Sequence, residues 1–203
     1  MTTASTILNR LKDETAPMHE QIEENEYATA IMNNHLTMDQ YKAYLVKFYG
    51  FIKPLEIRFE DVEQPPGSAL TEPSRNKTAW LEHDLMALGL DRTALDTVPQ
   101  CDSLPDVSTR ARALGCLYVL EGSTLGGQMI TKKLSQYLPI DPADNGRYFN
   151  SYGADTRERW QAFRQELLAE ADSAEKETQM IEAARDTFVL LDRWITDTLP
   201  PAH

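Results

Sequence analysis

Cysteine is scarce in this sequence of 203 residues, which contains only Cys101 and Cys116. Two cysteines can form at most one disulfide, and this pair matches neither a CxxC motif nor the Cys/His spacing of a zinc site. The sequence therefore indicates a reducing compartment, in which Cys116 is expected to be a small buried side chain.

Long apolar runs are also missing, because none approaches the ~20 residues that cross a bilayer. Residues 1–14 lack the apolar segment of a signal peptide. Positive charge is sparse too, with 20 Lys and Arg against 32 Asp and Glu and a formal net charge of -12. This charge disfavours binding to nucleic-acid phosphates, which needs a basic face, and argues mildly against binding to anionic lipids. We expect a cytoplasmic protein with neither a nucleic-acid nor a membrane partner.

Strand patterns are absent as well, since apolar and polar residues do not alternate between hairpin turns. Apolar residues recur instead at helical spacing. We expect helices over residues 5–24, 37–54, 74–88, 107–138, 156–172 and 174–199, with turns or a short helix in 93–106. The length fits one core. The sequence predicts an all-α fold with a single domain over residues 1–203.

Several residues predict where these helices begin, bend and end. Thr37 followed by Gln40 is typical of a capping box, and Gly89 is typical of a helix C-terminus. Pro17 should bend the first helix, and Pro54 should kink or end the second, because proline lacks the backbone N–H donor.

The first candidate for chemistry is a charged stripe on the helix over 5–24. Lys12 and His19 are seven residues apart and differ by about 20° around the axis. Glu23 lies one turn beyond His19, where a carboxylate can hold one ring nitrogen while the other binds a metal. The alternative is an ordinary solvated face of charged residues.

The second candidate is a group of glycines inside the helix over 107–138. Each interior glycine costs roughly 1 kcal/mol relative to alanine. Gly115, Gly122 and Gly126 lie within about 40° of one another around the axis and form a strip without side chains. Either a ligand or a closely packed helix can use such a strip. The adjacent Gly126 and Gly127 favour a flat cofactor, because the pair allows bending and exposes backbone polar groups.

A histidine on one helix and a bare wall on another suit a heme iron. At these residues the sequence resembles the heme oxygenase family, most closely the bacterial branch associated with phytochromes. The resemblance covers residues 5–197 and depends on five blocks in order, LKDETAPMHEQIEE, KTAWLEHDLMALG, YVLEGSTLGGQMITKKL, FRQEL and ARDTFVLLDRW. It implies a helical fold with heme between a proximal helix and a kinked distal helix.

The resemblance also implies roles for individual residues. His19 matches the ligand of the heme iron, and Lys12 matches a lysine that contacts a propionate. Arg164 matches a second propionate contact, for which Gln165 is the alternative. The residues expected to contact heme are Lys12, Thr15, His19, Glu23, Tyr118, Arg164 and Phe188. The residues expected to shape the reaction are Gly122, Ser123, Gly126 and Gly127.

Ser123 departs from the family pattern, because the animal enzymes carry an aspartate there that anchors distal water. A serine hydroxyl can orient water but cannot hold a negative charge. The proton-delivery route is therefore expected to depend on other groups.

By the resemblance, heme b is both cofactor and substrate, and O2 with an external electron donor opens it to biliverdin, carbon monoxide and Fe2+. The expected donor is a ferredoxin or flavodoxin with its reductase, for which Lys12, Lys132 and Lys133 offer contacts. A phytochrome is the expected bilin acceptor, and opening is expected at the α-meso carbon.

Three alternatives remain from the sequence. The first is a heme carrier or sensor without turnover. The second is another reaction on the same fold, but a di-iron site is disfavoured because no paired Glu-x-x-His motif is present, although spacing buries Glu121. The third is an interaction protein that packs through its glycines.

Overall fold

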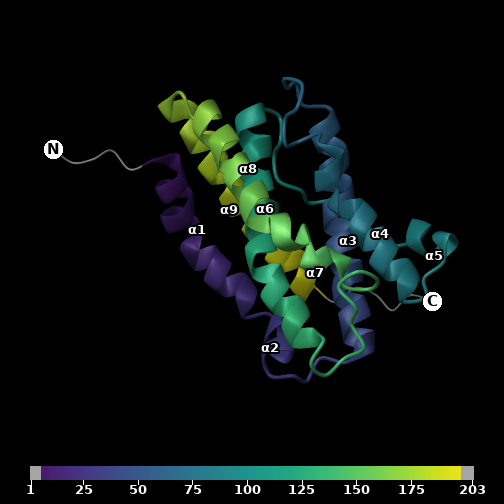
Figure 1. Cartoon of the computed structure of the whole chain (residues 1–203). Coiled ribbons are helices and arrows are strands. Elements are labelled where there is room, and N and C mark those ends of the chain that lie inside the picture. The colour runs from purple at the N-terminus through teal and green to yellow at the C-terminus, as the bar shows by residue number, and fades with distance from the viewer. Residues whose placement is uncertain (1–5, 198–203) are drawn as a thin grey trace.

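The computed structural model describes residues 6–197, which form helices and connecting segments without a β-strand (Figure 1). The elements are α1 (Ile7–Glu23), α2 (Glu26–Met32), α3 (Met38–Glu60), η1 (Pro73–Arg75), α4 (Lys77–Ala87), α5 (Arg92–Asp96), α6 (Arg110–Leu134), α7 (Arg147–Asn150), η2 (Gly153–Asp155), α8 (Thr156–Glu170) and α9 (Ala174–Thr196). The all-α prediction is confirmed. Residue 5 and residues 198–199, expected at helix ends, lie outside the described part.

Helix α9 is the common neighbour of the helices that position the site. It packs against α6, α1 and α3, and α1 also contacts α8. Figure 1 shows α1 crossing one side of the α6 and α9 pair, with α3 and α4 on the opposite side. The apolar residues of α9 that recur at helical spacing, Ile181, Phe188, Leu191 and Ile195, are all buried. None of the helices over residues 6–197 is long and apolar enough to cross a bilayer.

Helix α3 runs past Pro54 to Glu60, so the expectation that this proline ends the helix is wrong. A proline at this position leaves the carbonyl oxygen of Gly50 without its helical donor. The backbone N–H of Cys101 donates to that oxygen at 2.8 Å. A loop distant in sequence thus replaces the missing hydrogen bond and allows the helix to continue. Helix α1 likewise continues through Pro17.

The capping predictions are confirmed. Thr37 and Gln40 form the reciprocal capping box that begins α3. Gly89 has φ 91°, and the N–H of Leu90 donates to the carbonyl of Leu85 at 3.0 Å, which ends α4. Helices α2 and α7 were not predicted from the sequence. Each is too short to show a periodic pattern, and α2 begins at an Asn25 side chain that accepts from the N–H of Ala28.

Candidate functional site

His19 lies near the end of α1 with its side chain 54% exposed. Its Nδ1 atom is 3.7 Å from Oε2 of Glu23, which is longer than a hydrogen bond but close enough for the carboxylate to attract an N–H there. The ring packs edge-on against Phe188 of α9, with centroids 5.6 Å apart and planes at 76°. Within residues 6–197, Nε2 has no hydrogen-bond partner. The structure therefore brings two other predicted residues, Glu23 and Phe188, to the exposed imidazole of His19.

Three further predicted residues meet where α1, α6 and α8 converge. Thr15 is 3% exposed, and its hydroxyl donates to the carbonyl of Leu11 at 2.6 Å. Burial raises the pKa of Tyr118, while the Thr15 hydroxyl and the positive charge of Arg164 lower it, so both groups lie near the phenol. Lys12 is exposed one turn before Thr15 on α1. Neither Lys12 nor Arg164 forms an ion pair within the described chain, which leaves two cations available to an anionic ligand.

The glycines of α6 do not form one uniform strip. A Cβ atom at Gly115 would overlap the backbone of Met180, and one at Gly127 would overlap the carbonyl oxygen of Phe149. These two glycines allow α9 and α7 to approach α6 closely. A Cβ atom at Gly126 would meet nothing within 4 Å, so the space beside this residue is open. Helix α6 remains continuous through Gly126 and Gly127. The structure therefore assigns Gly127 to packing and Gly126 to the open face.

Two exposed apolar side chains that the sequence did not predict as part of the site lie to one side of this open face. Leu125 is 45% exposed and Met129 is 62% exposed. At 100° per residue, both lie within about 100° of Gly126 around the axis. Large exposed apolar side chains around a bare position are typical of a binding surface. Their position beside Gly126 in the sequence is the signal that identifies them.

Ser123 is exposed, and its hydroxyl donates to the carbonyl of Leu120 at 2.9 Å. The hydroxyl proton is therefore held by the residue's own helix. The oxygen keeps lone pairs that can accept a hydrogen bond from water.

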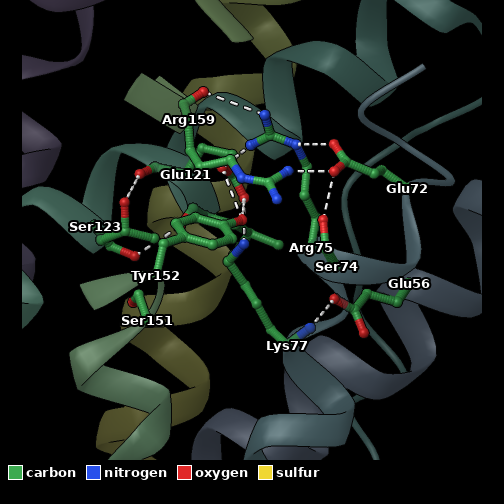
Figure 2. A network of polar contacts seen from close by, with 12 residues as sticks. Glu56, Glu72, Ser74, Arg75, Lys77, Glu121, Ser123, Ser151, Tyr152 and Arg159 are labelled. Carbon is green, nitrogen blue, oxygen red and sulfur yellow. Dashed lines mark hydrogen bonds and ion pairs between the residues drawn. The ribbon is translucent and has the colours of Figure 1, made fainter. Parts of the chain in front are cut away.

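A buried ion network around Glu121 holds α6 in place (Figure 2). Glu121 is 1% exposed, as expected from its spacing, and accepts from Nη1 of Arg75 and Nζ of Lys77. The hydroxyl of Tyr152 donates to the two carboxylate oxygens of Glu121 at 2.8 and 3.0 Å. Burial and the Glu121 charge raise the pKa of Tyr152, which keeps this hydroxyl a donor. Helix α6 is thereby tied to η1, α4 and the segment after α7.

The described residues contain no group of three or more His, Cys, Asp or Glu side chains that could hold a metal ion. A di-iron site therefore has no ligand set there. A lone histidine instead suits an iron whose remaining ligands come from a macrocycle. The free Nε2 of His19, the open space at Gly126 and the unpaired cations Lys12 and Arg164 fit an iron porphyrin with acidic substituents.

The structure thus defines a helical protein with an exposed histidine on α1 and an open, glycine-containing face on α6, the two parts of the candidate site. Residues 5–197 match the heme oxygenase family, and the chain belongs to that family. No curated protein matches it.

Solved structures share the fold at low identity. Heme oxygenase from Leptospira interrogans superposes with a TM-score of 0.77 at 16% identity, covering 95% of this chain and 99% of that one. The NO- and CO-bound heme oxygenase of Neisseria meningitidis gives 0.71 at 22%, covering 95% and 93%. A domain of unknown function with a heme oxygenase-like fold, from Shewanella denitrificans OS217, gives 0.67 at 12%, covering 95% and 91%. These likenesses show the fold and leave the activity to be argued from the site.

Proposed function

We propose that this chain is a heme oxygenase that uses O2 and an external reductant to open heme to biliverdin, releasing carbon monoxide and Fe2+. The observation that carries the proposal is the exposed His19 imidazole, which has Glu23 beside Nδ1 and no partner on Nε2 within residues 6–197. Membership of the heme oxygenase family supports the same activity.

The residues of the site divide the work of holding heme. His19 would bind the iron through Nε2, and Phe188 supports the imidazole from the side. Lys12 and Arg164 would pair with the propionates, because both are exposed cations without a carboxylate partner in the described chain. When bound, heme supplies the iron that binds O2 and the ring that is oxidised. Glu23 would orient the imidazole through Nδ1.

Helix α6 would cover the other side of the ligand. The bare position at Gly126 admits a flat molecule close to the backbone, and Leu125 and Met129 exclude water from its surface. The lone pairs of Ser123 can accept from one water molecule at the edge of this face. The chain therefore positions the ligand and excludes water from it, while an external donor supplies the electrons for the reaction.

The external donor is expected to be a ferredoxin or flavodoxin with its reductase. Lys132 is exposed and Lys133 is partly buried in the last turn of α6, whereas Lys12 lies on α1. On a chain with a net charge of -12, such lysines would favour docking of an acidic protein. A cytoplasmic location and a phytochrome as bilin acceptor remain predictions of the same proposal.

A heme carrier or sensor of the same fold is the second candidate. It is favoured by Ser123, whose hydroxyl proton is bonded to Leu120 and which lacks the charge of a carboxylate. A weaker distal water network would slow ring opening without weakening heme binding.

An optical titration of the apoprotein with hemin tests the proposal, with His19→Ala as the variant. His35→Ala is the matched control, because this histidine is exposed before α3 and has no predicted role. One equivalent should give a sharp Soret band in wild type and control, and His19→Ala should lose the ligated spectrum.

Addition of reductant and O2 then separates the two candidates. An oxygenase converts the Soret band to a bilin absorbance, whereas a carrier keeps it. Diffuse and equal binding of hemin to all three proteins would refute both candidates.

A further inference from the structure

Trp160 of α8 closes one end of the open face of α6. A Cβ atom at Gly122 would lie 3.8 Å from Cη2 and 4.0 Å from Cζ3 of this indole. The indole also packs on the ring of Tyr118, with centroids 5.7 Å apart and planes at 46°. One turn further along α6, a Cβ atom at Gly126 would meet nothing within 4 Å. The open face therefore begins where the indole ends.

The buried ion network fixes the indole relative to α6. Nη1 of Arg75 donates to the Glu121 carboxylate, and Nη2 donates to the backbone carbonyl of Arg159 at 3.2 Å (Figure 2). Glu121 immediately precedes Gly122, and Arg159 immediately precedes Trp160. A single guanidinium, 5% exposed, thus joins the side chain that precedes Gly122 on α6 to the backbone that precedes Trp160 on α8. Arg159 is further held by an ion pair with Glu72.

We propose, on the basis of the heme-opening function above, that Trp160 is a specificity-determining residue of this site. Its indole stops the tetrapyrrole at the Gly122 end of α6 and so sets which edge of the ring lies beside Gly126. Arg75 is a positioning residue that acts through Trp160. The interaction is aromatic packing, since an indole can pack against the edge or face of a flat apolar ring.

The test compares Trp160→Ala and Trp160→Phe with wild type. Trp194→Phe is the matched control, because Trp194 packs on α3 through a hydrogen bond to Lys47 and lies outside the proposed site. Three quantities are measured: the Kd for hemin, the heme-methyl proton shifts of the ferric cyanide complex, and the bilin isomers formed on turnover. The methyl shifts report how heme is seated in the protein and do not depend on activity.

Trp160→Ala should weaken hemin binding about two- to tenfold, the range of an aromatic contact. It should also change the methyl-shift pattern and yield a second bilin isomer. Trp160→Phe should change these quantities less, and Trp194→Phe should leave them as in wild type. Arg75→Lys keeps the positive charge but cannot contact both the Glu121 carboxylate and the Arg159 carbonyl. This variant should shift the methyl pattern in the same direction as Trp160→Ala.

The inference is overturned if Trp160→Ala folds and matches wild type in both Kd and methyl shifts, since the indole would then only pack α8 on α6. If Trp160→Ala does not fold, an unchanged methyl pattern in Trp160→Phe overturns it instead. A different result would show that the proposed function alone is wrong. Wild type would then bind hemin in a Trp160-dependent manner without opening the ring. Wild type that binds no stoichiometric hemin would overturn both.

Discussion

Alanine substitutions at the adjacent Gly126 and Gly127 should change stability in opposite directions. A Cβ atom at residue 126 meets nothing within 4 Å, whereas one at residue 127 overlaps the carbonyl oxygen of Phe149. That carbonyl belongs to α7, whose first amides are held by the buried carboxylate of Asp84, with distances of 3.1 Å from the N of Arg147 and 2.8 Å from the N of Tyr148. The α7 backbone therefore cannot move away without breaking these bonds.

The expected magnitudes follow from two opposing effects. Replacing a helical glycine by alanine gains roughly 1 kcal/mol, because the unfolded chain loses conformational freedom. Gly126→Ala should keep most of this gain and raise the Tm of the apoprotein by about 2–4 °C. Overpacking costs about 1–3 kcal/mol, and the overlap at residue 127 is with a fixed backbone atom. Gly127→Ala should therefore lose up to about 2 kcal/mol net and lower the Tm by several degrees.

Urea unfolding of the two apoproteins, followed by far-UV circular dichroism, measures these differences. Hemin titration of the same samples adds a second comparison. Gly126→Ala should bind hemin more weakly although its apoprotein is more stable, because the new methyl group occupies the open face. Stability changes of the same sign at both positions would refute the distinction between a packing glycine and an open one.

Three further predictions follow from the charged groups. Glu121→Ala should lower the free energy of unfolding by about 3–5 kcal/mol in urea titrations, since it removes the carboxylate partner of the buried Lys77 and leaves the buried Arg75 with Glu72 alone. Burial raises the pKa of Asp84 from 3.8 to about 6, against the opposing effects of two backbone amides and His83. Between about pH 6 and pH 4 the folded protein thus binds a proton at Asp84 that the unfolded chain releases. The free energy of unfolding should therefore rise as the pH falls through this range. Asp84→Asn should abolish the corresponding rise in the urea midpoint. The double variant Lys132→Glu, Lys133→Glu should slow heme reduction by ferredoxin in stopped-flow experiments while the Kd for hemin stays constant, and an unchanged rate would refute docking at these lysines.

The helices were predictable from sequence because their signals are local. The apolar spacing of α9 and the capping box at Thr37 act within a few residues of one another. The continuation of α3 past Pro54 was not predictable for the opposite reason, since the amide that compensates for the proline comes from Cys101, far along the chain. Helix α2 was missed because seven residues span too few turns to show a period.

The candidate site was predictable only in part. The stripe of α1 that carries His19 and Glu23 follows from helical geometry, and the structure places Phe188 beside it as the family resemblance implies. The partners of Glu121 could not be predicted, because Arg75 and Tyr152 reach it from segments 46 and 31 residues away. Trp160 had no local signal, since only the packing of α8 on α6 brings its indole to Gly122.

A glycine inside a helix indicates that something approaches closely, but its identity depends on the neighbouring element. On α6, the close backbone of α9 favours Gly115 and the close backbone of α7 favours Gly127, so alanine at either position would force a neighbouring backbone to shift. Nothing in the described chain excludes a side chain at Gly126. A residue that costs helix stability without serving the fold must be explained by what the fold binds. The open space at Gly126 is therefore a stronger argument for a ligand than the full set of glycines.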